Sequence, residues 1–149
     1  MKDNIGELID YLNKNDMKVF EGLTSLKKVR MVYNNFVSYY NYIDKAYKAK
    51  NETDRDRFAL EQDRFFSLAL KQVNLLNNQE KSMYLKLVHT KLQQTLDKVQ
   101  DFKVVDKMML FGTIVRQLPK DINEEDTDIK NSIENMFQEL NNRLEINVM

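Results

Sequence analysis

The stretch LKKVRMVYNNFVSYYNYIDKAY, residues 26–47, carries the clearest periodicity in the chain. Its apolar residues recur at intervals of three and four, which is the heptad pattern of a helix that buries one side. These positions are Leu26, Val29, Tyr33, Phe36, Tyr40, Ile43 and Tyr47. Tyrosine and valine also suit strands, but the strict alternation of a strand fails where Tyr39 adjoins Tyr40. We therefore predict one long aromatic helix, stabilised by tertiary packing.

The apolar face of this helix is wider than pairing with one other helix requires. Four residues beside the heptad positions are also apolar: Val32, Val37, Tyr39 and Ala46. A helix with that breadth of apolar surface normally packs against two or more neighbours in a bundle. We therefore expect the heptad rings, including Tyr33, Tyr40 and Tyr47, to lie inside the protein. Tyr42 falls outside the heptad, where a bundle core does not need it.

A shorter helical pattern precedes this stretch. Helical spacing first appears at Ile5, Leu8, Ile9 and Leu12. It predicts an amphipathic helix that stops near residues 13–16, followed by about one more helical turn at 17–21. Thr24 and Ser25 then offer potential side-chain caps for the start of the long helix. A charged link, residues 48–57, follows the long helix.

Two further helical segments occupy the middle of the chain. A third helix runs from Phe58 to Leu76 by the spacing of its apolar residues. Asn77 stands three residues before Glu80, which is a capping arrangement for the start of a fourth helix. Apolar residues continue at helical spacing through residues 85–118, either in that same helix or in one that is bent near Lys103.

Pro119 ends this pattern, because proline lacks an amide hydrogen and disfavours helix in the residue before it. An acidic link over residues 119–127 then precedes an amphipathic C-terminal helix over residues 128–145. The sum is an all-α fold, a single-domain bundle of five or six helices over residues 1–149 with mostly antiparallel neighbours. The scarcity of turn residues, three glycines and one proline, supports helices over a sheet.

Composition narrows the class of protein. Hydrophobic residues make up 42% of the chain and charged residues 31%, as in ordinary globular proteins. The longest mostly apolar run, residues 108–115, is too short to cross a bilayer, so no membrane partner is expected. The first residues lack the apolar core of a secretory signal, which favours the cytoplasm. Lysine and asparagine supply 33 residues, a bias typical of low-GC bacteria and their phages and plasmids.

Charge is distributed unevenly although the net charge is zero. Residues 81–120 carry a net charge of +5, and residues 121–149 carry −6. We expect the acidic C-terminal helix to lie against this basic block within the same chain, since opposite charges attract.

The residues needed for catalysis are scarce. The chain has no cysteine and one histidine, His89, with no second metal ligand three or four residues away. The carboxylates at Asp54 and Asp56, and those of residues 124–128, lie in polar links that predict capping and solubility roles. We therefore expect a protein that is not an enzyme and that has no cofactor and no metal site. His89 is predicted to lie at the edge of an apolar face.

Two functions remain open. The first is contact with another protein, as a small regulator, adaptor or inhibitor, which includes association with a second copy of the chain. Candidate interface residues are Tyr39, Tyr42, Met109 and Leu110. The alternative is a DNA-binding transcriptional regulator that uses a degenerate helix-turn-helix within residues 95–118, with its turn at residues 103–105. Candidate nucleic-acid contacts are Lys91, Lys98, Lys103, Lys107 and Arg116.

Overall fold

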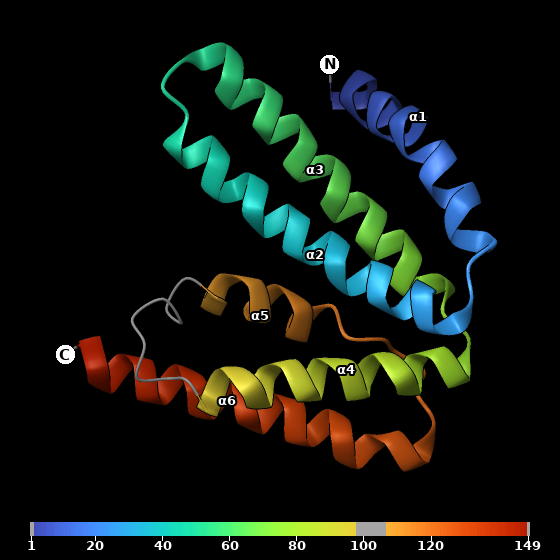
Figure 1. Cartoon of the computed structure of the whole chain (residues 1–149), viewed down its shortest axis with the longest axis vertical. Helices are drawn as coiled ribbons and strands as arrows, with labels where there is room; N and C mark the ends of the chain where they lie inside the picture. Colours follow the sequence, from blue (N-terminus) through green and yellow to red (C-terminus); the bar gives the residue numbers. More distant parts are fainter. Residues whose placement is uncertain (1, 98–106, 149) are drawn as a thin grey trace. The chain divides into compact units, whose positions relative to one another are not determined.

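A computed structural model describes residues 2–97 and 107–148. Over these residues the chain forms six α-helices, one 3-10 turn and no strand (Figure 1). The elements are α1 (Lys2–Glu21), α2 (Ser25–Lys48), α3 (Glu52–Leu75), α4 (Asn78–Asp97), α5 (Lys107–Arg116), η2 (Glu124–Asp126) and α6 (Thr127–Val148). The predicted all-α fold is confirmed.

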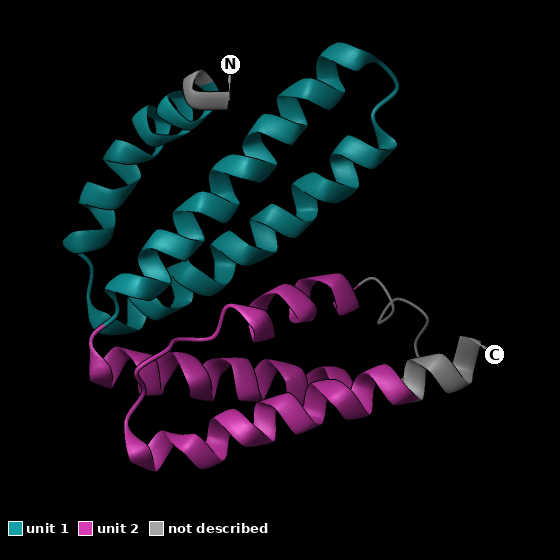
Figure 2. Ribbon diagram, turned by 180° about the vertical axis from the view of Figure 1, so that it is seen from behind, with its two compact units in different colours: residues 1–76 teal, residues 77–149 magenta. Residues whose placement is uncertain are grey.

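The helices divide into two compact units (Figure 2). The first unit, residues 1–76, holds α1, α2 and α3, and the second, residues 77–149, holds the remaining elements. The organisation of the whole chain as one domain stays a prediction.

In the first unit, α2 and α3 form an antiparallel hairpin, with α1 beside it. Three residues, 49–51, separate α2 from α3, so the two helices run back along each other. In both views α3 lies between α2 and α1 (Figures 1 and 2). The contact of α1 with α3 is much larger than its contact with α2. Within the first unit, α1 is therefore an edge helix with one main neighbour.

The predicted heptad of α2 is confirmed at Val29 and Phe36 and wrong at its ends. The other heptad positions, Tyr33, Tyr40 and Ile43, are half-buried. Val29 and Phe36 are fully buried. Leu26, in contrast, is exposed, and Tyr47 leaves 88% of its surface exposed to solvent. Both residues stand second from an end of α2, where a neighbouring helix covers a side chain least. The buried face also includes Val32, which the sequence places beside the heptad.

Side-chain caps fix the helix starts around the hairpin. The Thr24 hydroxyl accepts a hydrogen bond from the Lys27 amide at 3.4 Å, which confirms the predicted cap of α2. Asn51 does the same for α3, where its Oδ1 accepts from the Asp54 amide at 2.8 Å. The charged link predicted over residues 48–57 is therefore shorter than expected, because the Asn51 cap allows α3 to begin at Glu52.

The opening helix also differs from its prediction. The sequence pattern breaks at residues 13–16, yet α1 is continuous from Lys2 to Glu21. Asn13 lies in the middle of this helix and is 1% exposed. Its amide nitrogen donates to the backbone oxygen of Arg64 in α3 at 3.1 Å. The local sequence around Asn13 predicts the end of a helix. In the structure Asn13 instead forms a buried contact between α1 and α3.

In the second unit, α6 contacts both α4 and α5. The core is drawn from all three helices and includes Tyr84, Leu85, Val88 and Leu92 of α4, Phe111 and Ile114 of α5, and Ile133 and Leu140 of α6. The C-terminal helix therefore lies against helices of the basic block, as predicted. It begins at Thr127 and extends to Val148, slightly beyond the predicted range.

The ends of these helices follow the sequence signals closely. Asn77 and Glu80 form a reciprocal capping box, with the Glu80 amide donating to Asn77 at 2.8 Å and the Asn77 amide donating to Glu80 at 3.0 Å. α5 ends at Arg116, three residues before Pro119, as predicted. The predicted bend near Lys103 lies outside the described residues.

Candidate protein-interaction surface

The apolar residues of α1 divide between two neighbouring flanks of the helix. Ile9 and Phe20 are buried, as is Asn13 between them. On the adjoining flank lie four residues at helical spacing, each between 37% and 57% exposed. They are Ile5, Leu8, Leu12 and Val19. We call these four residues the α1 stripe.

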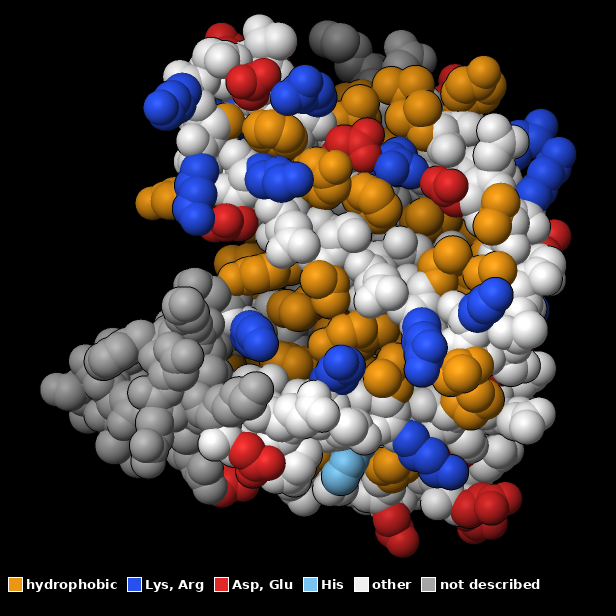
Figure 3. Space-filling model, viewed as in Figure 1, with side chains coloured by type: hydrophobic (Ala, Val, Ile, Leu, Met, Phe, Trp, Pro, Cys, Tyr) orange, Lys and Arg blue, Asp and Glu red, His pale blue; other side chains and the backbone are white. Residues whose placement is uncertain are grey.

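The α1 stripe is a row of partly exposed apolar residues along one side of the helix, with Asn15 between Leu12 and Val19. At the upper right of Figure 3, where α1 lies, hydrophobic side chains reach the surface among polar and charged ones. Tyr11, which is 76% exposed, adds an aromatic ring near the stripe. An amphipathic helix normally turns such a face toward its neighbours. Here the main neighbour, α3, covers only one flank.

Polar contacts hold the covered flank of α1 to α3, and most of them involve Arg64. Its guanidinium donates to Asp16 of α1 at 2.9 Å, and to Glu61 of α3 at 3.0 and 3.1 Å. It also approaches Oδ1 of Asn13 at 3.4 Å. The Arg64 side chain is 17% exposed, so these charge-assisted bonds are partly shielded from water. A second ion pair joins Asp10 to Lys71.

This arrangement holds α1 against α3 and leaves the α1 stripe partly exposed. Arginine suits the role because its planar fork donates to several oxygens at once. The stripe can therefore take part in contacts with another helix without loss of the contacts to α3. An apolar strip of this kind is the feature that a helix-to-helix docking mode uses.

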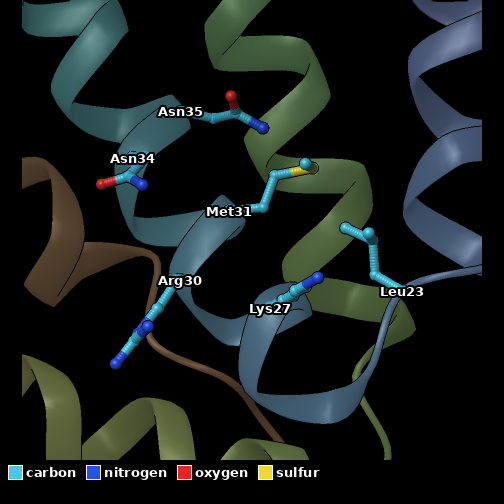
Figure 4. A pocket seen from close by; sticks show the side chains of 6 residues that line it. All are labelled: Leu23, Lys27, Arg30, Met31, Asn34 and Asn35. Carbon is cyan, nitrogen blue, oxygen red and sulfur yellow. The ribbon is translucent and has the colours of Figure 1, made fainter.

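A shallow cavity of about 340 Å³ lies along the same unit, and its lining comes mainly from α2. The lining residues are Leu23, Lys27, Arg30, Met31, Asn34 and Asn35. In Figure 4, Arg30 and Asn34 point to one side of α2, while Lys27 and Asn35 point to the other. A specific ligand site requires polar groups that converge on one point. The polar groups of this cavity do not converge.

Two of the predicted interface residues belong to the α2–α3 hairpin. The Tyr39 ring lies 4.9 Å from the ring of Phe66, and the Tyr42 ring stacks on Phe65 at 5.6 Å. Tyr42 also lies 6.2 Å from Phe58. The expectation that the fold has no use for Tyr42 is wrong, because the helix packs this ring against α3. A role for either tyrosine toward another protein stays a prediction.

The other two predicted interface residues stand next to each other in α5. Met109 is exposed, whereas Leu110 is buried in the same short helix. Met109 alone of this pair is accessible to a partner. Its role there stays a prediction.

The candidate nucleic-acid contacts are partly outside the described residues. Lys98 and Lys103 fall in the gap, together with the predicted turn at residues 103–105. Lys91 is exposed on α4, and Lys107 and Arg116 are exposed at the two ends of α5. The residues between those ends, 110–114, are buried. A helix that reads DNA needs its exposed face for base contacts, and α5 offers few residues for that purpose.

The histidine and the carboxylates have structural partners. Nε2 of His89 lies 3.1 Å from the Ser132 hydroxyl, in the contact between α4 and α6. Asp126 accepts a hydrogen bond from the Ser82 hydroxyl and is buried, so its predicted place in a solvated link is wrong. Asp54 lies in the capped first turn of α3, as the capping prediction requires. In the part of the chain that the structure describes, no three residues are grouped as a metal site needs.

No described helix has the length and apolar character that spanning a membrane requires. The chain matches no protein-family model, and neither the curated proteins nor the solved structures provide a match to it.

Proposed function

We propose that this chain is a non-catalytic helical protein that acts by helix-to-helix contact with another protein. The observation that carries the proposal is the partly exposed α1 stripe on a helix that α3 covers mainly on the other flank. Such a protein would serve as a small regulator, adaptor or inhibitor. Composition supports the cytoplasm of a low-GC bacterium, or a phage or plasmid of one, as its setting.

The size of the stripe supports a specific contact. Single exposed apolar residues are common on any protein surface, but contiguous rows of them mark interaction sites. Leu75 and Met109 are of the first kind, since each stands alone on its helix. The stripe instead extends over residues 5–19 of one helix. Scarcity of histidine and absence of cysteine in the sequence support a binding role over a catalytic one.

The test compares two double variants of the full chain. Ile5→Ser with Leu8→Ser removes half of the stripe, and Leu26→Ser with Leu75→Ser removes two exposed leucines outside it. Affinity-tagged proteins are used to capture partners from a native lysate, and circular dichroism checks that both variants fold. We expect the first variant to lose bound protein that the second retains. Equal capture by both variants would exclude the stripe as the docking surface.

The DNA-binding alternative has less support, because residues 110–114 in the centre of α5 are buried. It predicts salt-dependent retention on duplex DNA, since basic side chains displace counterions from the phosphates. Changing Lys98, Lys103, Lys107 and Arg116 to glutamate would abolish that retention. We expect the wild type and this variant to show the same weak retention.

A further inference from the structure

α2 is the most positively charged helix in the part of the chain that the structure describes. It carries five basic residues and one acidic residue, Asp44, which gives a net charge of +4 in a chain whose net charge is zero. The basic residues are Lys27, Lys28, Arg30, Lys45 and Lys48. No acidic residue occurs in residues 22–43, although the chain has 23 of them. The positive charge of α2 is therefore not balanced within the helix.

The exposed side of α2 is a polar row at helical spacing. Its residues follow one another at intervals of four, seven, four and three, which keeps them on one side of the helix. They are Arg30, Asn34, Asn41, Lys45 and Lys48, and all five are exposed. We call these five residues the α2 polar stripe. Ser38, which is half-buried, stands in the seven-residue interval. From Arg30 to Lys48 the stripe extends over about 27 Å of helix, at a rise of 1.5 Å per residue.

The α2 polar stripe lies on the side of the helix that its own unit leaves open. The opposite side holds the buried residues Val29, Val32 and Phe36. Because a helix turns by about 100° per residue, Asn34 and Lys45 project roughly opposite to Phe36. Within the first unit α3 lies between α2 and α1, so α2 is the second edge helix (Figure 1). The stripe is therefore accessible to a large partner.

We propose that the α2 polar stripe binds duplex DNA. The major groove of DNA, about 12 Å wide, admits an α-helix. Lysine and arginine bind the phosphates, and an asparagine amide can pair with the exposed edge of adenine. Basic residues stand at both ends of the stripe, and Asn34 and Asn41 stand between them. This order suits a helix that contacts phosphates at its ends and bases at its centre.

The same order disfavours other anionic partners. An acidic protein would favour basic residues along the whole contact, whereas the centre of the stripe is uncharged. Duplex RNA has a deep, narrow major groove that does not admit a helix. α5 is also basic, but residues 110–114 at its centre are buried, while α2 exposes a complete side. A helix that reads DNA requires such an exposed side.

Asp44 limits the affinity of the stripe. Its carboxylate pairs with Lys48 at 3.0 Å, and the side chains of Asp44 and Lys48 are 50% and 70% exposed. An exposed pair contributes little to stability, so Lys48 can exchange Asp44 for a phosphate. Removal of the carboxylate leaves Lys48 free for DNA and removes a repulsive charge. We therefore expect Asp44→Asn to bind duplex DNA several-fold more tightly than the wild type, and weaker binding would contradict the role of Lys48.

Fluorescence anisotropy of a short labelled duplex, measured over a range of salt concentrations, tests the proposal on the full chain. We expect micromolar affinity at low salt and a steep loss as salt rises, because bound phosphates release their counterions. Arg30→Gln with Lys45→Gln should bind several-fold more weakly. It should also reduce the slope of log affinity against log salt by about two, which is about one for each lost phosphate contact. No salt-dependent binding by the wild type would overturn the proposal.

Lys14→Gln with Lys18→Gln is the matched control, since it makes the same change of charge at two exposed lysines of α1. We expect this variant to bind DNA as the wild type does. Equal losses in the two double variants would show that only net charge matters, and would overturn the assignment to α2. Circular dichroism checks that both variants fold.

The amides and the choice of nucleic acid are tested in the same assay. Asn34→Ala with Asn41→Ala should weaken binding and keep the salt slope, because amides carry no charge. Unchanged affinity would contradict a helix that lies in the groove. Duplex RNA of the same sequence and polyglutamate should each displace the labelled DNA only at much higher concentration than unlabelled duplex DNA. Equal displacement by polyglutamate would indicate an acidic protein as the partner, and equal displacement by RNA would exclude major-groove binding.

This inference does not depend on the proposed function, because the α1 stripe and the α2 polar stripe lie on different helices. Ile5→Ser with Leu8→Ser should keep the DNA affinity of the wild type, although we expect it to lose captured protein. A loss of DNA affinity in this variant would contradict the assignment to α2 alone. The weak DNA retention that we expect to survive the glutamate changes around α5 is likewise assigned to α2.

Discussion

Asn35 of α2 and Gln72 of α3 form a buried hydrogen bond across the hairpin, with the Asn35 amide nitrogen donating to Gln72 Oε1 at 2.6 Å. Gln72 is fully buried, and its own amide nitrogen has no partner among the described residues. Two amides in an apolar core contribute little net stability, yet each depends on the other for satisfaction. Their main effect is on the alignment of the two helices.

This pair predicts strong non-additivity between substitutions. Gln72→Met alone leaves the Asn35 amide unsatisfied and should lower the free energy of unfolding by about 1–3 kcal/mol. Adding Asn35→Leu removes the unsatisfied group and should recover most of the loss. Urea unfolding followed by circular dichroism measures both. Additive effects of the two changes would mean that the side chains do not interact.

The Arg64 cluster predicts an unequal response to loss of two cations of α3. Arg64→Met breaks charge-assisted bonds to Asp16 and Glu61, and it should cost about 1–3 kcal/mol of unfolding free energy. Lys71→Met is the matched control. Its partner is Asp10, and both side chains of that pair are more than a third exposed, so the change should cost less than about 1 kcal/mol.

Thermal unfolding of both variants at low and high salt provides the measurement. We expect added salt to reduce the small effect at Lys71 more than the effect at Arg64, because exposed pairs are screened more strongly. Equal losses of stability in Arg64→Met and Lys71→Met would contradict the larger contribution that we assign to Arg64.

The capping box at the start of α4 predicts a ranking of substitutions at Asn77. Asn77→Ala removes the acceptor for the Glu80 amide and should destabilise the protein by about 1 kcal/mol. Asn77→Asp and Asn77→Ser keep an acceptor and should be close to the wild type. Chemical unfolding of the three variants gives the comparison. If Asn77→Ala were as stable as Asn77→Ser, the hydrogen bond from the Glu80 amide to Asn77 would not contribute to stability.

Burial raises the pKa of the Tyr33 phenol above its ordinary value. The native state therefore holds this proton more tightly than the unfolded state does. The resulting stability is present below about pH 10, the ordinary tyrosine value, and is lost as the pH rises through the raised pKa. Tyr33→Phe should make the decline of stability above that pH less steep.

Absorbance titration of the phenolate checks this expectation. The wild type should show a late-ionising component, and Tyr33→Phe should reduce it. An unchanged late component in the variant would assign that component to another tyrosine.

Local sequence signals determined most helix ends correctly. The caps at Thr24 and Asn77 and the stop at Pro119 all act within a few residues of the chain, so the sequence reveals them. The continuity of α1 is different, because Asn13 is satisfied by Arg64, which lies 51 residues away. Asp126 is likewise buried through Ser82, 44 residues earlier. Partners at such separations cannot be read from a local pattern.

The candidate surface was visible in the sequence only in part. The spacing of Ile5, Leu8 and Leu12 identifies an amphipathic helix, but it does not tell which residues a neighbour covers. That depends on the number of helices around α1, which tertiary packing decides. The same limit applies to Tyr42. Its ring stacks on Phe65 of α3, a contact that the local pattern of α2 does not reveal.

The edge position of α1 has a dynamic consequence. A helix with one main neighbour opens locally at lower free energy than the hairpin beside it, and its backbone amides exchange with solvent sooner. Whatever occupies the stripe binds only the closed form, so it slows that exchange in proportion to its concentration and affinity. Hydrogen exchange along α1 would then report occupancy even when the complex is too short-lived to isolate.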